Sequence, residues 1–191
     1  MKAAIIIAFV TALAVNASAQ TTVYAGSEPG KAGVAGTVDV TATIVAIDKA
    51  ARDITLKGPK GNEVVVTAGP EVKNFDQMKV GDQVHAKYVE ALVLELKKGG
   101  GATVARTEQA GVMGAKPGAQ PAGLVGRQVT VVADVIAVDP ATQTVTLKGP
   151  QRTVEVKVAD ADQFKRIAKG DQVEATYTQA LAMVVEPSPK K

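Results

Sequence analysis

The chain has 191 residues, a formal net charge of +3 and no cysteine. Without cysteine, disulfide bonds and thiol catalysis are excluded, and the fold must depend on apolar burial. Only 3% of the residues are aromatic and no cluster of like charge is present. The chain therefore lacks the basic face and the stacking platforms of a nucleic-acid-binding protein.

The first nineteen residues have the layout of a secretory signal peptide. Met1-Lys2 is followed by an apolar stretch from Ala3 to Val15 and by Ala17-Ser18-Ala19. This order predicts cleavage after Ala19 and export, most simply to a bacterial periplasm. The apolar stretch is too short to span a bilayer comfortably, so we expect no membrane span.

Two parts of the chain repeat each other. The run Thr55–Pro59 recurs as Thr146–Pro150, and Gly81–Val84 recurs as Gly170–Val173. Such a repeat defines the structural unit. The predicted division is a signal peptide (1–19), a flexible lead (20–35), a first repeat (36–98), a Gly/Pro-rich linker (99–123), a second repeat (124–186) and a tail (187–191).

Within each repeat the apolar residues mostly alternate, which is typical of strands with one buried face. The first repeat is expected to form strands at 38–47, 54–57, 63–67, 84–88 and 91–96, with a helical turn at 75–78. The second repeat is expected to form the matching elements at 129–138, 145–148, 154–158, 173–177 and 180–185, with a helical turn at 164–167. We therefore predict an all-β protein made of two tandem, small, OB-like, five-stranded antiparallel barrels.

Candidate catalytic groups are few. Ser18, Ser27 and Ser188 fall in the predicted signal, lead and tail, and His85 is the single histidine. No Ser-His or Cys-His arrangement can be assembled from them. We therefore expect a non-enzymatic protein without a cofactor.

One outward-facing pair is present in both repeats and is not required by packing: Thr55 with Lys57, and Thr146 with Lys148. The corresponding face of an OB fold is a common ligand platform. These four residues are the candidate binding face, and the expected partner is an envelope protein or a small ligand. The alternative is that the lysines only protect strand edges from aggregation.

The segments around Ala46–Pro59 and Lys79–Val84 resemble small exported bacterial domains of unknown function with an OB-like barrel. A more distant similarity is to periplasmic copper-efflux metallochaperones, which bind Cu(I) through a His and two Met beside a Trp. This chain has no Trp. The resemblance implies the fold, and it leaves periplasmic copper binding through His85 and Met78 as the alternative function. The positions that match these two residues in the second repeat are Glu174 and Ile167.

Overall fold

The computed structural model describes residues 20–70 and 72–188, and it confirms the prediction of an all-β protein. The predicted signal peptide lies outside the described residues. The strands are β1 (Gln20–Glu28), β2 (Lys31–Asp48), β3 (Asp53–Lys57), β4 (Glu63–Thr67), β5 (Gln83–Lys97), β6 (Arg106–Gly114), β7 (Ala122–Asp139), β8 (Thr144–Lys148), β9 (Thr153–Lys157) and β10 (Gln172–Glu186). The helical segments are the 3-10 helix η1 (Phe75–Gln77) and α1 (Ala161–Phe164).

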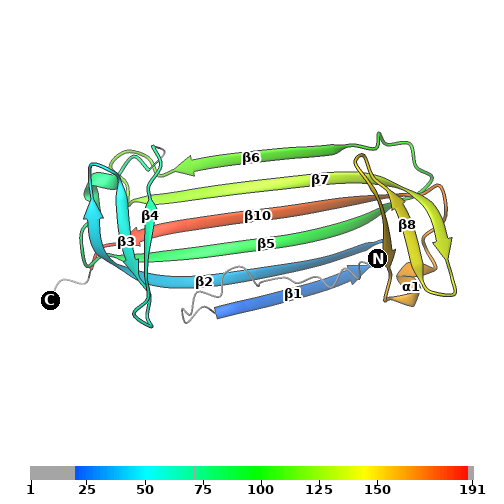
Figure 1. Cartoon of the computed structure of the whole chain (residues 1–191), viewed down its shortest axis with the longest axis horizontal. Helices are drawn as coiled ribbons and strands as arrows, with labels where there is room; N and C mark the ends of the chain where they lie inside the picture. Colours follow the sequence, from blue (N-terminus) through cyan, green and yellow to red (C-terminus); the bar gives the residue numbers. More distant parts are fainter. Residues whose placement is uncertain (1–19, 71, 189–191) are drawn as a thin grey trace.

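The strands form one continuous antiparallel sheet rather than the two tandem barrels expected from the sequence. Its order is β4-β3-β2-β5-β10-β7-β8-β9, with β1 added to β2 and β6 added to β7. The first and second halves of the chain meet at the centre, where β5 pairs with β10. In Figure 1 the long strands run side by side across the middle of the molecule.

The length of β5 explains why two separate barrels do not form. The sequence suggested two strands, at 84–88 and 91–96, but only Val89 and Glu90 lie between them. Neither residue favours a chain reversal, since turns are usually made by Gly, Pro, Asn, Asp or Ser. The chain therefore continues straight as β5, and β10 does the same in the second half.

The predicted flexible lead and linker also differ from the structure. Residues 20–35 contain β1 and the start of β2, and residues 99–123 contain β6 and the start of β7. In β1, a run of β-branched and aromatic residues, Thr22-Val23-Tyr24, favours an extended chain. The long strands β2 and β7 offer each of these segments an edge to pair with. The Gly-rich composition of the lead and the linker therefore does not prevent them from forming the edge strands β1 and β6.

Two small lobes stand at opposite ends of the sheet (Figure 1). Lobe 1 consists of the end of β2 with β3, β4 and η1, and lobe 2 of the end of β7 with β8, β9 and α1. Each begins at a register shift, between Ile44 and Ala46 in β2 and between Val135 and Ala137 in β7. Such bulges bend a strand.

Both lobes lie on the same face of the central sheet. On β5, Val84 belongs to the core of lobe 1 and Leu96 borders lobe 2. Side chains an even number of residues apart point to the same side of a strand. We call this the inner face, and the opposite one the outer face.

The cores confirm the predicted apolar residues. Phe75, Met78, Ile54 and Leu56 are buried in lobe 1. Phe164 and Val145 are buried in lobe 2, where Ile167 is only partly buried. The alternating pattern therefore identified the buried side of the short strands correctly.

Each lobe is completed by the other half of the chain. Val185 of β10 lies in the core of lobe 1, and Leu96 of β5 borders lobe 2. Two buried aspartates make matching links. Asp82 accepts a hydrogen bond from the backbone N–H of Ser188 at 3.2 Å, and Asp171 accepts one from Gly99 at 3.1 Å. The halves are therefore interlocked rather than independent.

A second pair of links ties each helical segment to the hairpin turn of the other half. The Asn74 side chain donates to the carbonyl oxygen of Lys116 at 2.7 Å and accepts from the N–H of Gly118 at 3.1 Å. The Gln163 side chain donates to the carbonyl oxygen of Glu28 at 2.6 Å and accepts from the N–H of Gly30 at 2.9 Å. These bonds hold the ends of β1, β2, β6 and β7 against the lobes.

Candidate functional site

The four residues of the predicted binding face do not form one surface. Thr55 and Lys57 lie on β3 and Thr146 and Lys148 on β8, at opposite ends of the sheet (Figure 1). Lys57 lies 3.8 Å from Glu63 on the neighbouring strand. Any partner that touched both pairs at once would have to extend along the whole sheet.

His85 and Met78, the alternative metal ligands, lie on opposite sides of the sheet. Met78 is buried in lobe 1, whereas His85 points to the outer face, next to Val84 of that core. The His85 ring is hydrogen-bonded to Thr41 at 3.1 Å and lies 3.4 Å from Glu186. This geometry does not bring a thioether to the imidazole.

The outer face near His85 has a broad, open hollow of about 920 Å³, which Lys57 also borders. Two pairs of its polar side chains contact each other: Lys87 lies 3.6 Å from Asp39, and Thr41 is hydrogen-bonded to His85. Among residues 20–70 and 72–188, no group of three or more His, Cys, Asp and Glu side chains is placed to hold a metal ion. In the same ranges no helix has the length and apolarity that crossing a membrane requires.

The centre of the inner face carries a polar cluster. Tyr177 donates a hydrogen bond to Glu90, and Gln179 donates one to the Tyr88 hydroxyl at 2.9 Å. Burial and the neighbouring Glu90 carboxylate raise the pKa of the Tyr177 phenol above its ordinary value. The cluster is satisfied internally and holds β5 against β10.

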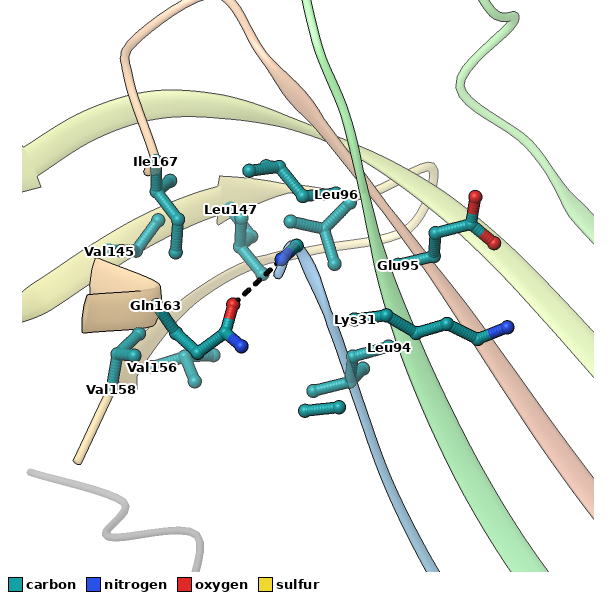
Figure 2. A pocket seen from close by; sticks show the side chains of 13 residues that line it. Lys31, Leu94, Glu95, Leu96, Val145, Leu147, Val156, Val158, Gln163 and Ile167 are labelled. Atoms are coloured by element: carbon teal, nitrogen blue, oxygen red, sulfur yellow. Dashed lines mark hydrogen bonds between the residues drawn. The ribbon is translucent and has the colours of Figure 1, made fainter. Parts of the chain in front are cut away.

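Lobe 2 contains an apolar cavity of about 110 Å³ (Figure 2). Its walls come from β2, β5, β8, β9 and β10 and from the α1 region. The aliphatic side chains that line it are Leu94, Leu96, Val145, Leu147, Val156, Val158, Ile167 and Val173. Figure 2 shows the Gln163 side chain reaching across to Gly30 at the border of the cavity, while the Lys31 and Glu95 side chains point away from it. The site can therefore take an apolar group.

The two lobes differ in side-chain size at matching core positions. Ile44 and Ile54 of lobe 1 occupy the register positions that Val135 and Val145 occupy in lobe 2. Each valine is one carbon smaller, but other matching positions are larger in lobe 2, where Val158 replaces Ala68 and Leu96 replaces Val185. Leu56 is 7% exposed, whereas its counterpart Leu147 is only partly buried.

A charged clamp closes lobe 1. Arg52 donates hydrogen bonds to the carbonyl oxygens of Ala68 at 2.9 Å, Gly69 at 3.0 Å and Val72 at 2.8 Å. Its guanidinium carbon also lies 4.6 Å from the centre of the Phe75 ring. This stacking and these bonds hold the loop after β4 over the core.

Gln143 stands at the corresponding position of lobe 2. Both residues have positive φ, 59° for Arg52 and 52° for Gln143. The Arg52 carbonyl accepts a hydrogen bond from the N–H of Ala68, just after β4, and the Gln143 carbonyl accepts one from Val158, just after β9. The Gln143 side chain is shorter and uncharged, and it cannot reproduce the guanidinium clamp. Lobe 2 therefore has the same backbone arrangement as lobe 1 but lacks the arginine side chain that holds the loop over the core.

Sequence reasoning did not find this pocket. The available signal was the replacement of the charged Arg52 by the neutral Gln143 in the second half. No protein-family model, curated protein or solved structure matches this chain.

Proposed function

We propose that this chain is a non-enzymatic binding protein of the bacterial envelope that takes an aliphatic group of its partner into lobe 2. One observation carries the proposal: the two lobes share a backbone plan, yet the core residues of lobe 1 are closely buried, whereas lobe 2 holds a cavity of about 110 Å³. The export pattern of residues 1–19 supports the location.

The expected affinity of the pocket alone is low. Burying a leucine-sized side chain contributes about 2 kcal/mol. An apolar cavity of about 150 Å³ in another protein is large enough for benzene, so this one suits a branched aliphatic group. A partner would need further contacts outside the cavity to bind tightly.

The test is a titration of the purified mature chain with 3-methylbutan-1-ol, followed through the methyl resonances in NMR spectra. We expect the signals of Leu147 and Ile167 to shift and saturate, because both line the cavity. The signals of Leu56 and Met78 in lobe 1 are the internal control and should not move. Equal shifts in both lobes, or none in lobe 2, contradict the proposal.

The geometry does not favour metal binding as a second function. Its two candidate ligands, His85 and Met78, are separated by the sheet, and each has other neighbours.

A further inference from the structure

The middle of the inner face, between the two lobes, is an uncovered apolar surface. Residues opposite one another in register share a face, so Val38, Leu181 and Val125 lie on the inner face with Leu92. Val125 is 44% exposed, and the other three are partly exposed. Within the part of the chain that the structure describes, the strands in extensive contact are neighbours in the sheet, so no second layer lies over this surface. A sheet normally buries its apolar face against another layer.

The charges on this surface are balanced and paired within the chain. Between the lobes, the inner-face positions of the six central strands include four charged residues, namely Glu90, Arg106, Glu108 and Arg127. A guanidinium nitrogen of Arg106 and one of Arg127 each lie 2.6 Å from a Glu108 carboxylate oxygen. Glu90 accepts a hydrogen bond from Tyr177. Because two positive and two negative groups already have partners, the surface fits an apolar partner without net charge.

The lobes determine how a second layer can be placed on this face. Val84 lies in the core of lobe 1, and Leu96, twelve positions later on β5, borders lobe 2. Twelve residues of a strand span about 40 Å, and each lobe occupies about 5 Å of that length, which leaves about 30 Å between them. The six strands β1-β2-β5-β10-β7-β6 have five spacings and are together about 24 Å wide. A sheet of this width therefore fits between the lobes when its strands run crosswise.

These dimensions point to a second copy of the chain as the occupant. The gap between the lobes accepts a layer as wide as this chain's own central sheet, so two copies can each lie in the gap of the other. The contact would bury about 700 Å² on each copy, or about 1,400 Å² in total, which lies within the range of stable, specific interfaces. A twofold axis uses the same surface on both copies, so both uncovered faces are buried at once.

We propose that the protein is a dimer in which two copies pack inner face against inner face, with their central strands crossing at nearly a right angle. Sheets pack in this way in orthogonal β-sandwiches. The proposal goes beyond the binding function proposed for lobe 2. The 3-methylbutan-1-ol titration does not test it, and the two proposals can fail independently.

The first test is analytical ultracentrifugation of the whole mature chain over a hundredfold range of concentration. We expect a species of twice the chain mass that dissociates on dilution. A monomer throughout, or an assembly larger than a dimer, overturns the proposal. Phosphatidylglycerol vesicles are the second probe, and a monomer that sediments with them would assign the face to lipid and also overturn the dimer.

Two neighbouring residues of β5 identify the face involved. Leu92→Glu places an unpaired carboxylate in the middle of the inner face and should raise the dimer dissociation constant at least tenfold. Val93→Glu is the matched control on the outer face and should leave the constant unchanged. Circular dichroism and thermal unfolding of both variants check that the fold is kept. Equal effects of the two substitutions, or none from Leu92→Glu, contradict the assignment.

Cross-linking tests the same face without adding a charge. The chain has no cysteine, so a single introduced thiol reacts alone. Gln179→Cys lies at the centre of the inner face, and Thr178→Cys lies next to it on the outer face. Packed sheets are about 10 Å apart, so a bismaleimide of similar span should join two copies of Gln179→Cys and not of Thr178→Cys. Equal cross-linking of both variants, or of Thr178→Cys alone, overturns the proposal.

Discussion

Glu90 and Gln179 lie directly opposite one another at the centre of the sheet, on β5 and β10. They mark an approximate twofold axis, because each residue pair between β5 and β10 on one side of them has a counterpart on the other side. The pair Val84 and Val185, for example, corresponds to Val173 and Leu96. Each is hydrogen-bonded to a tyrosine, Glu90 to Tyr177 and Gln179 to Tyr88. The two halves therefore meet at a carboxylate in one position and an amide in the other.

Glu90→Gln should make this centre chemically symmetric. Burial and the Glu90 carboxylate both raise the pKa of Tyr177. The substitution removes the second cause and leaves the first, so the pKa of Tyr177 should fall but stay above its ordinary value. Ultraviolet absorbance during an alkaline titration measures the change, with Tyr177→Phe identifying the signal. An unchanged titration curve would show that Glu90 does not act on the phenol.

Val185→Ala tests the interlocking of the halves. Val185 is a second-half residue but is 5% exposed in the core of lobe 1. Its truncation should lower the free energy of unfolding by about 2 kcal/mol, through lost burial and a residual cavity. The neighbouring Val184, which is 37% exposed, is the control, and Val184→Ala should change stability by about 0.5 kcal/mol or less. Denaturant unfolding measures both, and equal effects would contradict the interlocked packing.

Arg52→Gln combined with Ile54→Val should open lobe 1. The first change removes the clamp over Phe75 and the second removes one carbon from the core, as in lobe 2. We expect a loss of about 2–4 kcal/mol in stability, from the lost hydrogen bonds and the new cavity. We also expect a second set of methyl shifts on addition of 3-methylbutan-1-ol. Binding that stays confined to lobe 2 would show that these two residues are not what closes lobe 1.

Asp171 should make stability depend on acidity. Burial raises its pKa, but hydrogen bonds from the Lys98 ammonium and from the N–H groups of Ala168 and Gly99 outweigh it and hold the pKa below the ordinary value. Because the pKa of Asp171 is lower in the folded state than in the unfolded chain, its ionised carboxylate stabilises the fold at pH values above the ordinary aspartate pKa. This contribution is lost as the pH falls below about 4.

Asp171→Asn should remove that component of the acid sensitivity and lower stability at neutral pH. Urea unfolding at a series of pH values tests both expectations. Lys98→Gln is the matched control: it removes the ammonium but keeps the backbone bonds, so it should produce the smaller change. A larger effect from Lys98→Gln would show that the stabilisation comes mainly from the ion pair between Lys98 and Asp171 instead.

The export proposal predicts the start of the mature protein. If the signal peptide is cleaved after Ala19, the mature chain begins at Gln20, the first residue of β1. Intact mass spectrometry of the protein from a periplasmic fraction measures this directly. A full-length mass, or recovery only from the cytosol, contradicts the proposed location.

The sequence alone determined the class of fold and the composition of the two cores. Burial could be predicted from local geometry alone, without knowledge of the partner strands. The signals were the alternation of Ile54 and Leu56 along a strand and the three-residue spacing of Phe75 and Met78. Asp48 and Asp139, which end β2 and β7, are of a residue type common in turns, and both accept hydrogen bonds from backbone N–H groups two residues on. The candidate lysines Lys57 and Lys148 were identified, but not that they lie at opposite ends of one sheet.

Only the tertiary structure decided how the halves combine. An alternating strand pairs equally well with any antiparallel neighbour, so the pattern of β5 does not reveal that its partner is β10. Because both strands run on past Glu90 and Gln179, each lobe receives residues from the other half. The pocket could not be predicted for the same reason. Side chains from several strands line it, and no single segment of the sequence contains them all.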